Sequence, residues 1–136
     1  MPLIQWDSSF SVGNQEIDRH HKKWVDAINS LHQTLMNGSS KELMEVTERV
    51  LKTIRDYTRN LFPYEEEYMQ KISYPDLQAH KKIHNKFYVK ILNYYNEFQE
   101  GRMVINTEIM STLMLWLQDH ILHEDKKYGE YAARQK

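Results

Sequence analysis

The segment that decides the fold runs from Tyr57 to His84, YTRNLFPYEEEYMQKISYPDLQAHKKIH. It places Glu65 near the end of one predicted helix and His80 and His84 near the start of the next, joined by the short connection Ser73–Pro75. Residues four apart share a helix face, so the two histidines point the same way. Two imidazoles facing a carboxylate from a neighbouring antiparallel helix are a typical way for a helical bundle to gather ligands for a transition metal.

Apolar residues recur at helical spacing on both sides of this segment. With four Gly and three Pro in 136 residues, helix breakers are few, which favours a small number of long helices. The pattern predicts helices over residues 14–37, 40–72, 75–100 and 107–124. Pro63 falls inside the second of them, where proline typically kinks a helix.

Four amphipathic helices with short connections predict one all-α domain over residues 1–136. We expect an up-down-up-down antiparallel four-helix bundle. Residues 1–13 read as an ordered N-terminal arm that lies across it, and residues 126–136 as a short charged C-terminal tail.

Composition narrows the classes of function. Eighteen basic and 19 acidic side chains give a net charge of -1, so there is no electrostatic reason to expect a nucleic-acid or membrane-surface partner. No cysteine is present, which excludes disulfides, thiolate ligands and a catalytic thiol. The N-terminus lacks the features of a signal peptide and no apolar run is long enough to span a bilayer, so we expect a cytoplasmic protein, monomeric or weakly oligomeric.

Five polar residues fall on the apolar stripes that face the predicted core. They are His21, Glu65, His80, His84 and His120. For any one histidine, a hydrogen-bonded core imidazole is the simpler interpretation. Four of them on three helices, with a carboxylate on the other helix, leave too many buried polar groups to satisfy one another, and a cation would satisfy them together. Imidazole and carboxylate ligands without thiolate suit iron, manganese or zinc.

Motifs along almost the whole chain then show a resemblance to a known family. They are Trp6, Val12-Gly13, Ile17-Asp18, Tyr57-Thr58, Phe62, Glu65-Glu66, Tyr74-Pro75, Trp116-Leu117, His120-Ile121, Asp125 and Lys126-Lys127-Tyr128. Together they resemble the hemerythrins, and specifically the single-domain bacteriohemerythrins.

The resemblance implies a di-iron centre that binds dioxygen reversibly. One iron would be held by His80, His84 and His120. The second iron, to which dioxygen adds, would be held by His21. Bridges between the two would come from Glu65, Asp125 and a solvent-derived oxo or hydroxo group.

One position departs from the family pattern, because Leu61 stands where the family has a histidine ligand of the second iron. Leucine cannot coordinate, which leaves three possible outcomes. Water fills the gap, which we expect; or only the three-histidine site is filled and the protein binds one iron; or a nearby side chain substitutes, the candidates being His20, Tyr57, Tyr64, Glu66 and His123.

Three functions follow from these outcomes. We expect an oxygen-binding protein, for carriage, storage or sensing, with an altered second-iron site. The enzymatic alternative is a di-iron oxidase or peroxidase-like activity, since open coordination and water access favour oxidation over reversible binding. The third possibility is a binding module that holds a single metal.

Overall fold

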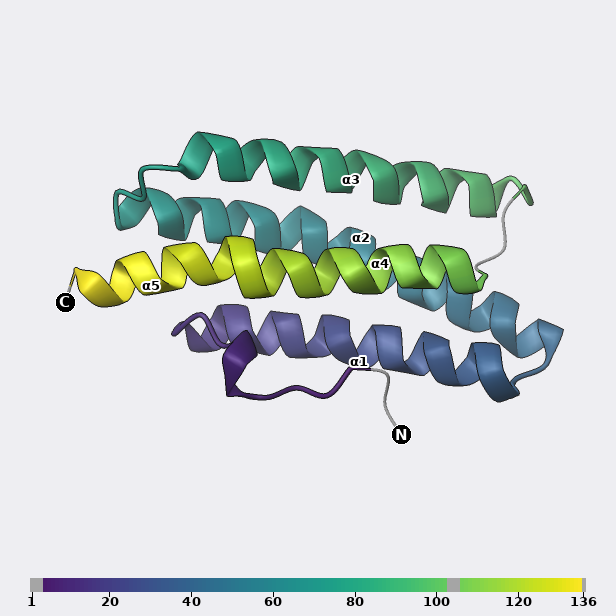
Figure 1. Cartoon of the computed structure of the whole chain (residues 1–136). Coiled ribbons are helices and arrows are strands. Elements are labelled where there is room, and N and C mark those ends of the chain that lie inside the picture. The colour runs from purple at the N-terminus through teal and green to yellow at the C-terminus, as the bar shows by residue number, and fades with distance from the viewer. Residues whose placement is uncertain (1–3, 103–105, 136) are drawn as a thin grey trace.

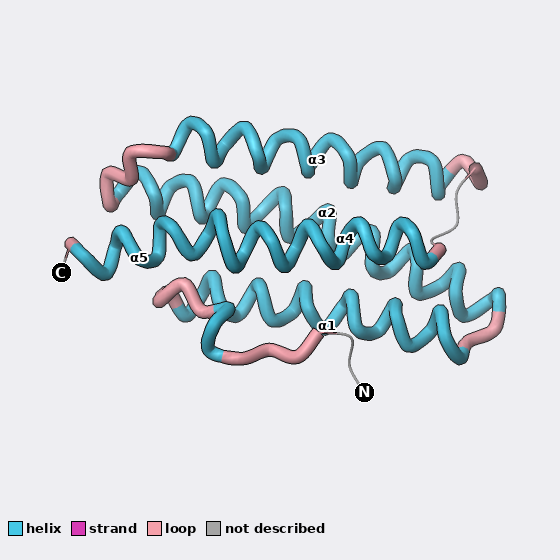
Figure 2. The backbone as a smooth tube through the Cα atoms, in the orientation of Figure 1, coloured by secondary structure: helices cyan, strands magenta, loops and turns pink. Residues whose placement is uncertain are grey.

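Antiparallel helices form the whole fold, seen in a computed structural model that describes residues 4–102 and 106–135. Successive long helices alternate in direction (Figure 1), and no strand occurs in that part of the chain (Figure 2). The elements are η1 (Ser8–Phe10), α1 (Gln15–Asn37), α2 (Ser40–Lys71), α3 (Leu77–Gln99), α4 (Thr107–Asp119), the π-helix η2 (His120–Asp125) and α5 (Lys126–Arg134). The predicted all-α four-helix bundle is therefore confirmed.

Three of the long helices begin at side-chain caps. Asn14, Ser39 and Asn106 each accept a hydrogen bond from the backbone N–H three residues on, at 2.9 to 3.2 Å. Such a cap typically contributes about 1 kcal/mol. The helix α2 runs on through Pro63 as far as Lys71.

Two helix boundaries differ from the sequence prediction by more than one residue. The third long helix begins at Leu77 instead of residue 75, because Ser73 adopts a left-handed conformation (φ 57°) and the turn extends to Asp76. After Asp125 the chain stays helical as α5, where we predicted a charged tail. The inner face of α5 buries Tyr128 and Ala132, so this segment belongs to the bundle.

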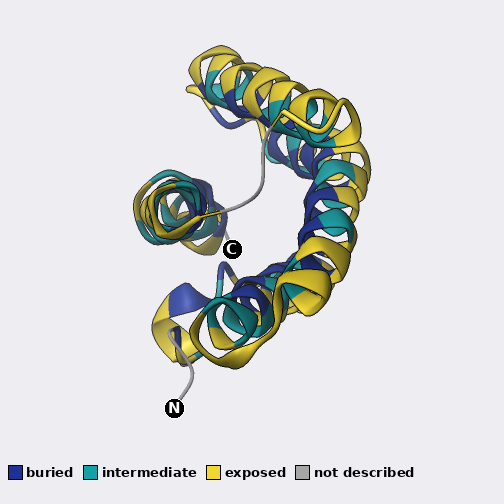
Figure 3. Cartoon of the chain, turned by 90° about the vertical axis from the view of Figure 1, so that its right-hand side faces the viewer, coloured by how far each residue is buried: buried dark blue, intermediate teal, exposed yellow. Residues whose placement is uncertain are grey.

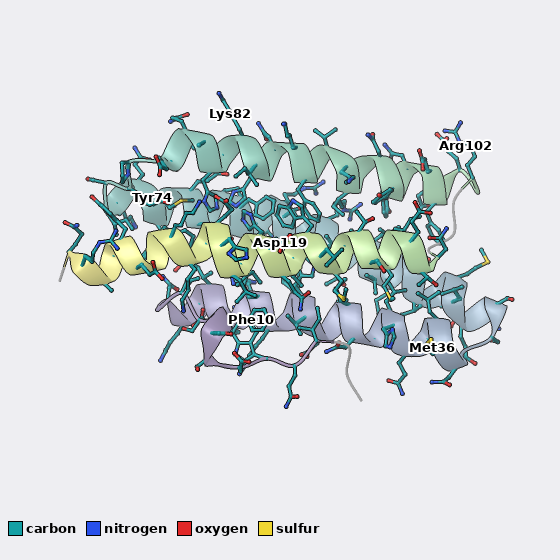
Figure 4. The ribbon with its side chains drawn as sticks, in the orientation of Figure 1. Phe10, Met36, Tyr74, Lys82, Arg102 and Asp119 are labelled. Carbon is teal, nitrogen blue, oxygen red and sulfur yellow. The ribbon has the colours of Figure 1, made fainter. Side chains whose placement is uncertain are left out.

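The buried faces of the helices turn toward a common interior (Figure 3). Most of the core is a single apolar cluster in which the aromatic rings of Trp24, Phe87 and Trp116 pack together. A second, smaller cluster consists of Val12, Ile17, Leu61, Met69, Tyr74 and Tyr128. Tyr74 marks this end of the bundle, where α5 also lies (Figure 4).

The described part of the N-terminal arm runs alongside α1 (Figure 1), while residues 1–3 lie outside the described residues. Ile4 exchanges two backbone hydrogen bonds with the Asn29 side chain, each 2.8 Å long. Further on, the Lys126 ammonium donates to the Ser11 carbonyl at 2.9 Å. The arm is thus tied to α1 and to the start of α5. None of the helices in the described ranges is long and apolar enough to cross a membrane.

Candidate metal centre

A short π-helix sets the position of two of the candidate ligands. His120 and Asp125 stand at its two ends, five residues apart. In an α-helix such residues would lie about 140° apart around the axis. The i→i+5 hydrogen bonding of a π-helix brings them onto one face instead, and His120 Nε2 lies 2.9 Å from Asp125 Oδ1. One local widening therefore makes both side chains available to the same site.

Three of the candidate histidines, His80, His84 and His120, come from α3 and η2. His80 Nε2 lies 3.0 Å from Asp125 Oδ1, and His84 Nε2 lies 3.1 Å from His120 Nε2. Together with Glu65 of α2, these residues are buried and each offers a ligand atom within 4.8 Å of all the others. The structure brings together five of the six residues that the sequence singled out.

The sixth residue, His21 of α1, approaches the same carboxylates from another side. Its Nε2 lies 3.2 Å from Asp125 Oδ2 and 3.7 Å from Glu65 Oε1. Asp125 thus presents one oxygen to His80 and His120 and the other to His21. All of these side chains are almost completely buried.

Hydrogen bonding leaves several of these polar atoms unsatisfied. Both oxygens of Asp125, Glu65 Oε1 and His80 Nε2 are buried without a hydrogen-bond partner. Orphaned polar atoms of this kind are costly in a protein interior. Two nitrogens bound at right angles to one ion at about 2.1 Å lie about 3 Å apart, which matches the Nε2–Nε2 separation of 3.1 Å between His84 and His120. The donor atoms therefore fit a cation.

Charge differs between the histidines in the absence of a metal. Burial on its own would lower the pKa of His21, but the carboxylates of Asp125 and Glu65 raise it to about 10. Burial lowers the pKa of His84, and the neighbouring Glu66 offsets this only in part. Burial would raise the pKa of Asp125, but the imidazoles around it hold that pKa well below its usual value. A cation that binds here must therefore displace a proton from His21.

Leu61, the position where the resemblance implies a histidine ligand, is part of an apolar wall. Leu61 is 1% exposed and belongs to the smaller cluster with Ile17 and Tyr128. It therefore offers no donor atom on the side of the site where His21 lies.

None of the five possible substitutes forms a hydrogen bond or ion pair with His21, Glu65 or Asp125 within the described part of the chain. His20 pairs with Glu16 at 3.2 Å, and its ring meets the edge of Tyr57. Glu66 pairs with His84 instead. The two others, Tyr64 and His123, are exposed.

A residue that the sequence reasoning left in the tail reaches the site. Tyr128 is fully buried and donates from its hydroxyl to Glu65 Oε2 at 2.8 Å. This bond orients the Glu65 carboxylate, whose other oxygen faces His21. The spacing of Ile121, Asp125, Tyr128 and Ala132, four, three and four residues apart, is the helical signal that could have placed Tyr128 inside.

Comparison with known proteins agrees with this site. The Hemerythrin HHE cation binding domain matches residues 12–132. The chain is 32% identical to a bacteriohemerythrin of Stenotrophomonas maltophilia, over 96% of this chain and 82% of that protein. It is 34% identical to one of Pseudomonas aeruginosa, over 94% of this chain and 80% of that protein.

Among solved structures, the crystal structure of a wild-type hemerythrin superposes with a TM-score of 0.81 at 30% identity, covering 96% of this chain and 98% of that chain. A hemerythrin variant with a leucine-to-tyrosine substitution gives a TM-score of 0.85 at 29% identity, covering 98% and 99% of the two chains. The family binds iron, and the buried cluster can hold a metal ion. Since the match spans most of the sequence and the fold agrees throughout, the chain belongs to the hemerythrin family.

Proposed function

We propose that this chain is an iron protein that binds dioxygen, for carriage, storage or sensing, at a centre with two unequal iron positions. In the proposal His80, His84 and His120 hold one iron, His21 holds the other, and Glu65 and Asp125 serve both. The observation that carries it is the arrangement around Asp125, whose Oδ1 faces two imidazoles while Oδ2 faces the third. A carboxylate contacted on both of its oxygens by imidazoles is arranged to bridge two cations.

The apolar interior of the bundle supports binding over oxidation. Ferrous iron, when bound, supplies the reducing centre to which dioxygen has affinity. Ile28, Leu31, Leu117 and Ile121 are each at most 1% exposed and provide dry walls within the bundle. Leu61 adds apolar surface on the side of His21, where the family pattern has a histidine ligand. A dry site limits the access of water that promotes oxidation.

A mononuclear protein is the second candidate, and Leu61 is the observation that favours it. The second iron would keep only His21 and the two shared carboxylates as protein ligands. Fewer ligands reduce affinity, so this position is expected to lose its metal first. The two candidates differ in the number of irons per chain.

The test is the iron content per chain, with the optical spectrum in air, after anaerobic reconstitution with ferrous iron. Wild type and His21→Asn are compared, with His123→Asn as the matched control because His123 is exposed and takes no part in the cluster. We expect two irons and near-ultraviolet charge-transfer bands in wild type and in the control, and one iron without these bands in His21→Asn. A wild-type protein with one iron, unchanged by His21→Asn, would establish the mononuclear candidate. Failure of wild type to retain iron would refute both.

A further inference from the structure

The outer nitrogen of one candidate ligand is bound by a carboxylate that the site itself does not use. His84 Nδ1 lies 2.8 Å from Glu66 Oε2, while His84 Nε2 faces the cluster. His84 is 2% exposed, and the side chain of Glu66 is 22% exposed. A buried imidazole is therefore linked through one carboxylate to the surface of the bundle.

Two of the other candidate ligands, His21 and His120, are not held in this way. The Nδ1 atoms of His21 and His120 are buried and have no hydrogen-bond partner. Hydrogen bonding of one ring nitrogen to a carboxylate fixes which nitrogen carries the proton, and makes the other a stronger donor to a metal. His84 is thus oriented by a contact that His21 and His120 lack.

Two residues one turn apart on α2 contact the His84 imidazole from different directions. Phe62 stacks flat on the His84 ring, with centroids 3.8 Å apart and planes 3° apart. Glu66, four residues later on the same helix face, binds the ring in its own plane. The Phe62 stack restricts tilting of the His84 ring. Of the two contacts, only the Glu66 carboxylate determines which ring nitrogen carries the proton.

We propose that Glu66 is a positioning residue for the three-histidine half of the centre. Its carboxylate accepts the Nδ1 proton of His84, which leaves Nε2 free to bind iron and strengthens it as a donor. Its negative charge also stabilises the oxidised form of an iron held there. The proposal rests on the proposed iron site at His80, His84 and His120, but it requires only this half to be filled.

Glu66 lies where substitution does little harm to the core. It lines a cavity of about 250 Å³ between α2 and α3, together with Arg59, Pro63 and Tyr88. Its neighbour Glu67 is exposed and pairs with Lys71 at 3.5 Å on the outside of α2. Glu67 therefore provides a matched control that has the same charge on the same helix.

The experiment compares Glu66→Gln, Glu66→Leu and Glu67→Leu with wild type. The measurements are the rate at which a chelator removes iron and the midpoint potential of the iron. For Glu66→Leu we expect release about 10- to 100-fold faster, as is typical when an outer partner of a ligand is lost. Glu66→Gln keeps an amide oxygen that accepts the Nδ1 proton, so its rate of iron release should lie between those of wild type and Glu66→Leu. Both Glu66 variants should show a higher potential, because the negative charge is gone.

A spectroscopic measurement separates positioning from packing. In the zinc-loaded protein, which is diamagnetic, the Nδ1 proton of His84 should appear as a slowly exchanging resonance in wild type and Glu66→Gln. It should be lost in Glu66→Leu. Glu67→Leu should match wild type in every measurement.

Two results would overturn the proposal. Equal release rates and potentials in Glu66→Leu and Glu67→Leu would show that the Phe62 stack alone holds His84. Persistence of the protected Nδ1 resonance in Glu66→Leu would show that another group accepts that proton. Failure of the proposed function looks different, because wild type would then retain no iron at all.

Discussion

The two halves of the proposed metal centre share their carboxylates but differ in almost everything else. In the half built by α3 and η2, three imidazoles converge with Asp125 and Glu65, and Glu66 contacts the outer nitrogen of one of the three. In the half beside α1, His21 is the one imidazole, and Leu61 presents an apolar wall. The comparison teaches that a single side chain on α2, at position 61, can decide whether this part of the proposed centre has a ligand or an apolar wall, while α2 itself stays helical from Ser40 to Lys71.

Removal of the shared carboxylate should break both halves together. Asp125→Asn deprives three imidazoles of their anionic partner, so we expect almost no iron to be retained. The metal-free protein should also lose about 3–5 kcal/mol of stability, as is typical when one partner of a buried ion pair is removed. Iron analysis and urea unfolding check both expectations. Asp119→Asn on the exposed face of α4 (Figure 4) is the control, and iron retention in Asp125→Asn would contradict the shared role.

A histidine at position 61 should change iron binding only in the half beside α1. Leu61→His adds an imidazole on the side of His21, and we expect the second iron to dissociate about 10- to 100-fold more slowly, an effect comparable to that of other supporting residues of metal sites. The release of the first iron should stay the same. In the metal-free protein the buried imidazole should cost about 1–3 kcal/mol. Two-phase release to a chelator measures these rates, and a change confined to the slow phase would contradict this assignment of the two halves.

The buried hydrogen bond from Tyr128 to Glu65 should contribute more to stability than a hydrogen bond at the surface. Tyr128→Phe leaves the buried Glu65 carboxylate without its donor, so we expect a loss of about 1.5–3 kcal/mol in the metal-free protein. Tyr131 makes an exposed bond to the Ser73 carbonyl at 3.1 Å, and Tyr131→Phe should cost about 0.5 kcal/mol. Denaturant midpoints of the two variants provide the comparison. Equal losses would show that Glu65 does not depend on Tyr128.

The pH dependence of the stability of the metal-free protein should also differ between the two halves. The pKa of His21 is raised from 6.5 to about 10, so its stabilising charge is complete below pH 6.5 and is lost as the pH rises toward 10. The expected loss is at most about 1.4 kcal/mol per pH unit in this window. The pKa of His84 is lowered, so His84 should contribute no such loss. Unfolding of wild type and His21→Asn at several pH values tests this, and equal slopes would contradict it.

Local regularities account for what the sequence determined. Helical hydrogen bonds join residues four apart, so the helices and the inward-facing His21, Glu65, His80, His84 and His120 follow from the spacing of residues. Asp125 was different, because only the resemblance to the hemerythrins singled it out. The same resemblance identified Leu61 as a departure from the family pattern.

Contacts between distant residues were decided only in the tertiary structure. Tyr128 and Glu65 are 63 residues apart, and Glu66 and His84 are 18 apart, so no sequence period links them. The sequence analysis named Glu66 as one of five possible substitute ligands and placed Tyr128 in the tail, yet each forms a hydrogen bond with a ligand candidate. The π-helix likewise has no distinct apolar period, because one widened turn shifts the pattern too little to be seen. At its two ends, His120 and Asp125 meet the rest of the candidate centre.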